Sequence, residues 1–143
     1  MCMLILAGGF GTRIKNAIGD TPKPLALVKN TPFLYFQIEN WLSQGVRSFV
    51  FLLHYRADEI EEFVLGLKNS LLLGCKVQFL VEPTPLDTGG AVAHAVRHFC
   101  IEENFLVVNA DTWVGNGIQN LIKNGAQSIA LVAEQNTDRF GRV

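Results

Sequence analysis

The sequence predicts an α/β fold with a mainly parallel, open sheet flanked by helices. Short apolar runs alternate along the chain with segments whose apolar residues recur at helical spacing. Each apolar run is too short for a helix, and strands that alternate with helices are typical of parallel sheets with right-handed crossovers. The chain has 143 residues, about the length of one domain.

The expected strands and helices alternate from the first residues onward. Strands are expected at 4–7, 49–53, 77–81, 105–108 and 129–133. Helices are expected over 33–41, 60–67, 92–99 and 118–122. Thr31 is the expected N-cap of the first helix, with Pro32 in its first turn, and Gly45 is expected to end that helix. Thr88 is expected to cap the third helix.

Composition excludes several classes of protein. Hydrophobic residues make up 49% and charged residues 17%, which excludes intrinsic disorder, and the formal net charge of -1 argues against nucleic-acid and anionic-membrane binding. Cys2, Cys75 and Cys100 have no metal-binding or disulfide-framework spacing. No apolar run approaches the ~18 residues of a membrane helix. We therefore expect a cytoplasmic protein with no nucleic-acid and no membrane partner.

A glycine-rich loop follows the first expected strand. Its sequence is Leu6-Ala7-Gly8-Gly9-Phe10-Gly11-Thr12-Arg13. Backbone N–H groups in such a loop can approach phosphate oxygens closely, and ligands of open parallel sheets bind beyond the carboxyl ends of the strands. The loop lacks the third glycine of the dinucleotide fingerprint and the lysine of the P-loop. A phosphate-binding loop and an ordinary turn both fit these residues.

Two further segments carry charged residues where chemistry is expected. The prolines of Pro22-Lys23-Pro24 restrict the backbone, so that Lys23 is held beside the glycine-rich loop or stands on a rigid surface turn. Asp111 follows the strand expected at 105–108, where a carboxylate can hold Mg²⁺ together with substrate oxygens. By spacing alone, a cap of the next turn explains Asp111 equally well.

Four motifs together resemble those of a known family. They are the glycine-rich loop, Pro22-Lys23-Pro24-Leu25, Glu82-Pro83-Thr84-Pro85-Leu86-Asp87-Thr88-Gly89-Gly90-Ala91 and Val107-Val108-Asn109-Ala110-Asp111-Thr112. Their order resembles that of the sugar-phosphate nucleotidyltransferases, the pyrophosphorylases that make nucleotide-sugars. Within that family the chain is most similar to the bacterial heptose-1-phosphate and mannose-1-phosphate guanylyltransferases. The resemblance implies a Rossmann-like nucleotidyltransferase fold of the glycosyltransferase-A type.

The resemblance also implies a reaction and its residues. A sugar 1-phosphate would attack the α-phosphorus of a nucleoside triphosphate, with Mg²⁺ as cofactor, and a homo-oligomer is compatible with the family. Arg13, Lys23 and Asp111 would be catalytic: Arg13 at the pyrophosphate, Lys23 at the reacting phosphates and Asp111 as metal ligand. The residues implied to bind the nucleotide are Leu6, Ala7, Gly8, Gly9, Gly11, Thr12, Arg13, Glu82, Thr88, Gly89 and Gly90.

Several choices stay open within the resemblance. GTP is expected over UTP because Glu82 could accept the N–H donors of guanine, although a solvated Glu82 fits as well. Asp87 stands where the guanylyl branch usually has glycine, which keeps a muramate-1-phosphate type of uridylyltransferase as an alternative. The family's second, later metal-binding aspartate has no match, since Asp138 comes too early. Residues 1–143 are thus expected to be the N-terminal, nucleotide-binding part of one nucleotidyltransferase domain, truncated at its C-terminus.

A non-catalytic function stays open, and one residue after an expected strand is not counted among the catalytic residues. A non-catalytic regulatory module that binds a nucleotide-sugar could use the same fold, because fold alone does not establish function. His54 follows the strand expected at 49–53 and is expected to belong to a polar loop rather than to the site.

Overall fold

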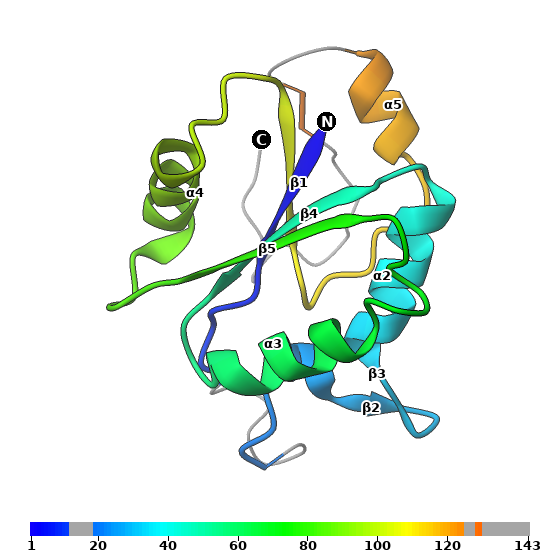
Figure 1. Cartoon of the computed structure of the whole chain (residues 1–143), viewed down its shortest axis with the longest axis vertical. Coiled ribbons are helices and arrows are strands. Elements are labelled where there is room, and N and C mark those ends of the chain that lie inside the picture. Colours follow the sequence, from blue (N-terminus) through cyan, green and yellow to red (C-terminus); the bar gives the residue numbers. More distant parts are fainter. Residues whose placement is uncertain (12–18, 125–127, 130–143) are drawn as a thin grey trace, which may run out of the picture. The chain divides into compact units, whose positions relative to one another are not determined.

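The computed structural model describes residues 1–11, 19–124 and 128–129. The chain divides into two compact units, Met1–Trp113 and Val114–Val143 (Figure 1). The described part of the second unit contains one helix, α5 (Ile118–Lys123), where a helix was expected. The strand expected at 129–133 lies, apart from Ile129, outside the described residues.

The first unit is built on a four-stranded parallel sheet. Its strands are β1 (Cys2–Leu6), β4 (Ser48–Leu53), β5 (Lys76–Val81) and β6 (Phe105–Asn109), in the order β5-β4-β1-β6. This arrangement confirms the expected parallel sheet and the first four expected strands. The strands are added outward from β1 through β4 to β5, and β6 then pairs with the other side of β1. The reversal of strand order beside β1 is where open α/β sheets form their ligand crevice.

Helices cover both faces of this sheet. The three long helices are α2 (Phe33–Ser43), α3 (Ala57–Gly66) and α4 (Asp87–His98). Figure 1 shows α4 on the opposite side of the sheet from α2 and α3. On the α4 side, Leu4, Val50, Leu52 and Leu80 of the sheet form a core cluster with Ala91 and Ala95 of the helix. On the other side, Trp41 of α2 packs against Phe49, with ring centroids 6.4 Å apart.

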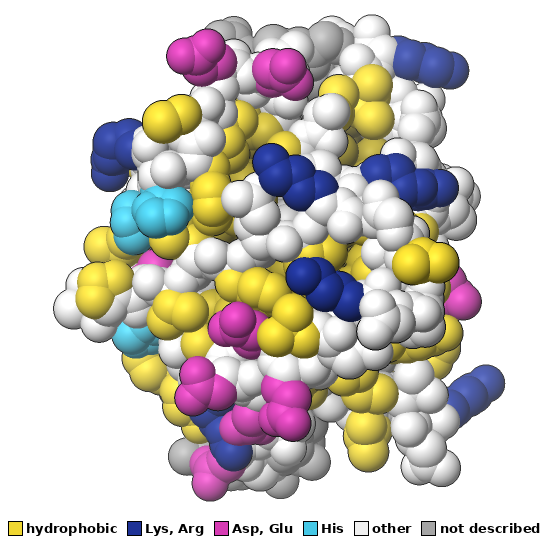
Figure 2. All heavy atoms as spheres, in the orientation of Figure 1, with side chains coloured by type: hydrophobic (Ala, Val, Ile, Leu, Met, Phe, Trp, Pro, Cys, Tyr) yellow, Lys and Arg dark blue, Asp and Glu magenta, His cyan; other side chains and the backbone are white. Residues whose placement is uncertain are grey.

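The helix α3 presents two faces of different character. Ile60 and Val64 are buried, whereas the sequence places acidic residues at the intervening positions. Figure 2 shows acidic side chains gathered over this helix on the viewed face. The apolar positions four residues apart thus face the sheet, as expected for an amphipathic surface helix.

A short hairpin before α2 shows that one predicted helix cap is wrong. The hairpin pairs β2 (Leu27–Val28) with β3 (Thr31–Pro32) around Lys29 and Asn30, whose φ angles are 50° and 65°. Two positive φ values are typical of a type I′ turn. Thr31 therefore pairs in a strand, and the N-cap of α2 is Pro32, with no side-chain hydrogen bond to the cap. The predicted Thr31 cap is wrong because the ladder with Val28 holds Thr31 one residue outside the helix.

Two other helix boundaries were also predicted. Gly45 follows the C-cap of α2 with a φ of 90° and donates its N–H to Leu42 O at 3.0 Å, which confirms the predicted end of that helix. The predicted Thr88 cap of α4 is wrong, since the helix begins at Asp87 and its N-cap is Leu86. Of the helices in the described part of the chain, none has the length and apolar character needed to cross a membrane.

Candidate active site

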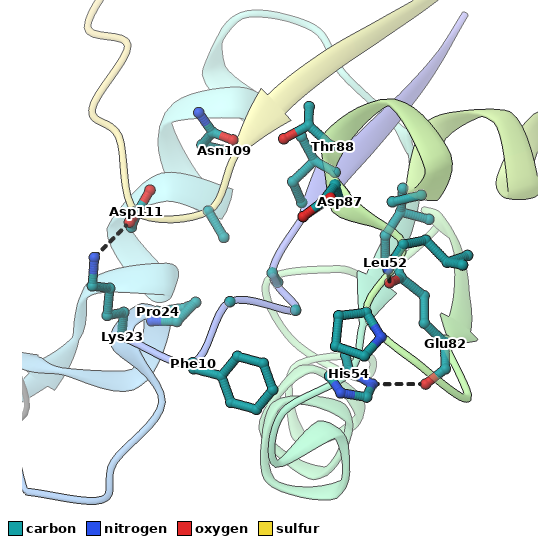
Figure 3. Close-up of a pocket in the computed structure, with 18 residues that line it drawn as sticks. Phe10, Lys23, Pro24, Leu52, His54, Glu82, Asp87, Thr88, Asn109 and Asp111 are labelled. Atoms are coloured by element: carbon teal, nitrogen blue, oxygen red, sulfur yellow. Dashed lines mark hydrogen bonds and ion pairs between the residues drawn. The ribbon is translucent and has the colours of Figure 1, made fainter. Parts of the chain in front are cut away.

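A cavity of about 340 Å³ lies at the carboxyl ends of the strands (Figure 3). It is lined by the predicted site residues Leu6, Ala7, Gly8, Gly9, Lys23, Glu82, Thr88 and Asp111. These residues come from the end of β1 and the segments after β1, β5 and β6, from the first turn of α4, and from η2, a short 3-10 helix at Lys23–Leu25. Residues that the sequence separates widely are thus brought to one cavity beside the reversal of strand order.

Not every predicted site residue lies on this cavity. Gly11, Gly89 and Gly90 do not line it. Thr12 and Arg13 lie outside the described residues, so the predicted role of Arg13 stays a prediction. The cavity wall also contains residues that sequence reasoning left out: Phe10, Pro24, Leu52, His54, Pro85, Leu86, Asp87, Ala91, Asn109 and Ala110.

The glycine-rich loop starts as an extension of β1. Ala7 donates its N–H to Leu52 O at 2.9 Å and is buried. A Cβ on Gly8 would lie 3.1 Å from the Cβ of His54 and 3.2 Å from its backbone nitrogen, so that any larger residue would press tightly against the segment after β4. A Cβ on Gly9, in contrast, would meet no atom within 4 Å. Within the described part of the protein, packing accounts for Gly8 and leaves open space beside Gly9.

Lys23 and Asp111 meet at one end of the cavity, which we call the Lys23 end. The Nζ of Lys23 lies 3.2 Å from Oδ2 of Asp111, and both side chains are partly exposed, at 26% and 44%. Lys23 is placed by η2, which begins after Pro22 and is anchored by its own buried residue, Pro24. Because the pair is exposed, it stabilises the fold by only ~0–1 kcal/mol, and both groups can exchange partners when a ligand binds.

Asp111 is placed by the end of β6. Ala110 donates its N–H to Leu6 O at 3.0 Å, which continues the pairing of β6 with β1 up to the residue before Asp111. The hydroxyl of Thr112 donates to Oδ1 of Asp111 at 3.5 Å. Among the described residues, no group of three His, Cys, Asp or Glu side chains could hold a metal ion. Within the described residues, Asp111 therefore has fewer than two His, Cys, Asp or Glu side chains placed to share a metal ion with it.

The opposite end of the cavity, which we call the Glu82 end, is formed by His54, Glu82 and Leu86. Glu82 is only 7% exposed, which excludes the solvated interpretation of its carboxylate. Its Oε2 accepts the N–H of Leu86 at 3.1 Å, and its backbone oxygen lies 2.8 Å from Nδ1 of His54. Glu82 thus holds the turn before α4, a role that its position in the sequence did not reveal.

His54 is the cavity residue that sequence reasoning most clearly missed. It was expected in a polar loop, yet its ring lies edge-on against Phe10 of the glycine-rich loop, with centroids 5.5 Å apart. Together with its contact to Glu82, this packing joins the segments after β1, β4 and β5. The signal was available, since His54 follows the end of β4 just as Glu82 follows the end of β5.

Asp87 and Gly90 shape the entry into α4. Asp87 lines the cavity with a φ of 56°, a conformation that favours glycine. A Cβ on Gly90 would lie 2.9 Å from the Cβ of Leu86. Gly90 is therefore required where Leu86 folds back over the first turn of the helix, although it does not line the cavity.

Known proteins resemble this chain over most of its length. The nucleotidyl transferase family matches residues 2–143. A D-glycero-alpha-D-manno-heptose 1-phosphate guanylyltransferase of Campylobacter jejuni is 33% identical over 144 residues, which cover 100% of this chain and 62% of that protein. A mannose-1-phosphate guanyltransferase of Gibberella zeae is 36% identical over 109 residues, or 76% of this chain and 29% of the relative. The chain therefore spans less than two thirds of these relatives.

A solved structure agrees with the sequence comparisons. The crystal structure of HddC from Yersinia pseudotuberculosis complexed with GMP-PN matches with a TM-score of 0.73 and 36% identity over 87% of this chain and 54% of that one. The structural likeness shows the Rossmann-like nucleotidyltransferase fold, and it agrees with the observed parallel sheet and strand order. On the family match over residues 2–143, this chain belongs to the nucleotidyl transferase family.

Proposed function

We propose that this chain binds a nucleoside triphosphate, with GTP preferred, and serves nucleotidyl transfer to a sugar 1-phosphate of the heptose or mannose type. The observation that carries the proposal is the meeting of the glycine-rich loop, Lys23, Asp111 and Glu82 at one cavity. Similarity to guanylyltransferases that cover this chain over most of its length supports the choice of reaction and base.

The reaction asks for positioning and positive charge rather than for a general base. A phosphate monoester has its second pKa near ~6, so the sugar phosphate is already largely ionised at neutral pH. Its oxygen would form a bond to the α-phosphorus while the bond to the β-phosphate oxygen breaks, and the electron pair leaves with pyrophosphate. Cations around the phosphates stabilise the charge that moves in this step.

The chain offers groups for each of these tasks. The open space beside Gly9 leaves room for a phosphate at backbone N–H groups. Lys23 would donate to the reacting phosphates once it parts from Asp111, and Arg13 is proposed at the departing pyrophosphate. The Glu82 end, where the Glu82 carboxylate is buried and hydrogen-bonded, would receive the base.

Mg²⁺ fits the residues at the Lys23 end. The carboxylate of Asp111 is 44% exposed and already has a cation, the ammonium of Lys23, as its neighbour. Mg²⁺ in proteins is commonly held by one or two carboxylates together with substrate phosphates and water. Asp111 would hold the ion, which would supply positive charge to the triphosphate when bound.

Calorimetric titration of the chain with GTP, UTP, dTTP and ATP tests the proposal, each with Mg²⁺ and with excess EDTA. We expect GTP to bind at least about tenfold more tightly than the others, because a base that leaves buried polar groups unpaired loses ~1–3 kcal/mol per group. Tighter binding of UTP would replace the guanylyl assignment with the uridylyl alternative. The absence of binding by any nucleotide would overturn the proposal.

A second measurement separates an enzyme from a regulatory module. Pyrophosphate release is followed after a sugar 1-phosphate is added to the chain with GTP and Mg²⁺. Release that needs both substrates supports nucleotidyl transfer. Tight GTP binding without pyrophosphate release from any heptose or mannose 1-phosphate would favour a non-catalytic binding role of this chain.

A further inference from the structure

Gln37 is a buried polar residue that does not line the cavity. It lies on α2, is 0% exposed, and donates from Nε2 to the backbone oxygen of Thr112 at 2.7 Å. Its Oε1 is buried and has no hydrogen-bond partner among the described residues. A buried polar atom without a partner carries a desolvation cost, so that fold stability alone does not account for glutamine at this position.

The partner of Gln37 directly follows the predicted metal ligand. Thr112 is the next residue after Asp111, and its own N–H makes only a long contact of 3.4 Å to Asn109 O. Ala110 is tied to β1 on the other side of Asp111. The hydrogen bond from Gln37 thus fixes the backbone on the side of Asp111 that the sheet does not hold.

We propose that Gln37 is a positioning residue that sets the place of the Asp111 carboxylate by holding the Thr112 carbonyl. The inference rests on the proposed function, because it assigns Asp111 to a metal bound with the nucleotide. A ligand carboxylate whose backbone can shift binds its metal less tightly, since part of the binding free energy is used to order it. Gln37 would act on metal binding without touching the metal or the nucleotide.

The test replaces Gln37 with methionine, which has a similar volume, favours helices and has no donor. Gln37→Leu is a second apolar variant, and Gln44→Met at the C-cap of α2 is the matched control. Two quantities are measured on each chain. The first is the hydrogen-exchange rate of the Thr112 amide without ligand, and the second is the Mg²⁺ concentration that half-saturates GTP binding, compared with the GTP affinity in EDTA.

In Gln37→Met we expect the Thr112 amide hydrogen to exchange several-fold faster. We also expect half-saturation of GTP binding to need about tenfold more Mg²⁺. That is the low end of the ~10–100-fold losses of metal affinity seen when groups that orient metal ligands are removed. GTP affinity in EDTA should not change, and Gln44→Met should behave as the unaltered chain. A purely structural role predicts lower thermal stability with an unchanged Mg²⁺ requirement, and that result in both apolar variants would overturn the inference.

The remaining outcomes separate this inference from the proposed function. If the unaltered chain binds GTP with Mg²⁺ and both Gln37 variants bind in the same way, the inference alone fails. If the unaltered chain binds no nucleotide, the proposed function fails and the inference fails with it, even where exchange of Thr112 is faster.

Discussion

Lys23 and Asp111 at one end of the cavity stand 88 positions apart in the sequence and share one exposed ion pair. At the other end, Glu82 is buried and uses its carboxylate, its N–H and its backbone oxygen to hold Leu86, Leu53 and His54. Figure 3 shows Lys23 and Asp111 on the opposite side of the cavity from His54 and Glu82.

The two ends differ in how firmly their polar groups are held before a ligand binds. Hydrogen bonds that are formed before a ligand arrives keep polar groups in fixed positions, and fixed polar groups discriminate between similar ligands. An exposed ion pair is weak, so its members can turn to a ligand at little cost. We therefore expect base selection at the Glu82 end and phosphate contacts at the Lys23 end.

The largest expected effect is a loss of nucleotide binding, with little change in stability, when Lys23 is replaced. Lys23→Ala should raise the dissociation constant of GTP with Mg²⁺ about 10–100-fold, because hydrogen bonds to charged groups contribute ~1.5–3 kcal/mol. The free energy of unfolding in urea should change by at most ~1 kcal/mol. Calorimetry and urea denaturation measure the two quantities.

Lys68→Ala, an exposed lysine beyond α3, is the control and should change neither quantity. Unchanged GTP binding in Lys23→Ala would remove Lys23 from the site. A large loss in the free energy of unfolding would instead show that Lys23, like Glu82, is needed to stabilise the fold.

Substitutions of Glu82 should lower the free energy of unfolding. Glu82→Ala leaves the N–H of the half-buried Leu86 without its charged acceptor, and we expect a loss of ~1–3 kcal/mol in the free energy of unfolding. Glu82→Gln keeps an oxygen acceptor and should cost less than half as much. Urea denaturation measures the free energy of unfolding of both variants. Equal losses in the two variants would contradict the view that the oxygen acceptor of Glu82 holds this end of the cavity in place.

The smallest expected effect concerns Asp87, whose φ of 56° favours glycine. Asp87→Gly should raise the stability by up to ~1 kcal/mol, since relief of a left-handed conformation outweighs the entropy that glycine loses on folding. Asp87→Ala keeps the strained backbone and has no side-chain polar group to support it, so it should be less stable than the unaltered chain. Thermal unfolding ranks the three, and any order other than glycine, aspartate, alanine contradicts the strain argument.

Local sequence signals located most of the fold because they depend on neighbouring residues. Apolar runs and helical spacing gave the four strands of the sheet and the helices between them. The rule that ligands bind beyond the carboxyl ends of parallel strands brought Gly8 and Asp111 to attention, and the two prolines around Lys23 drew attention to that residue. All three line one cavity.

The same local signals failed at Thr31 and Thr88. Thr31 has the side chain and the following proline of a helix start, yet it pairs with Val28 in a hairpin. At α4, the carboxylate of Glu82 accepts the N–H of the N-cap residue Leu86, and the helix begins before Thr88. Both results depend on partners that a capping pattern does not include.

The sequence by itself determined which segments form the four strands of the sheet, which form the helices and which loops follow the strands, because periodicity and turn chemistry act over a few residues. Only the tertiary structure decided that His54 joins the cavity, that Lys23 meets Asp111 and that Gln37 holds Thr112, 75 positions away. These contacts follow from the strand order β5-β4-β1-β6, which places distant segments side by side and which no local pattern encodes.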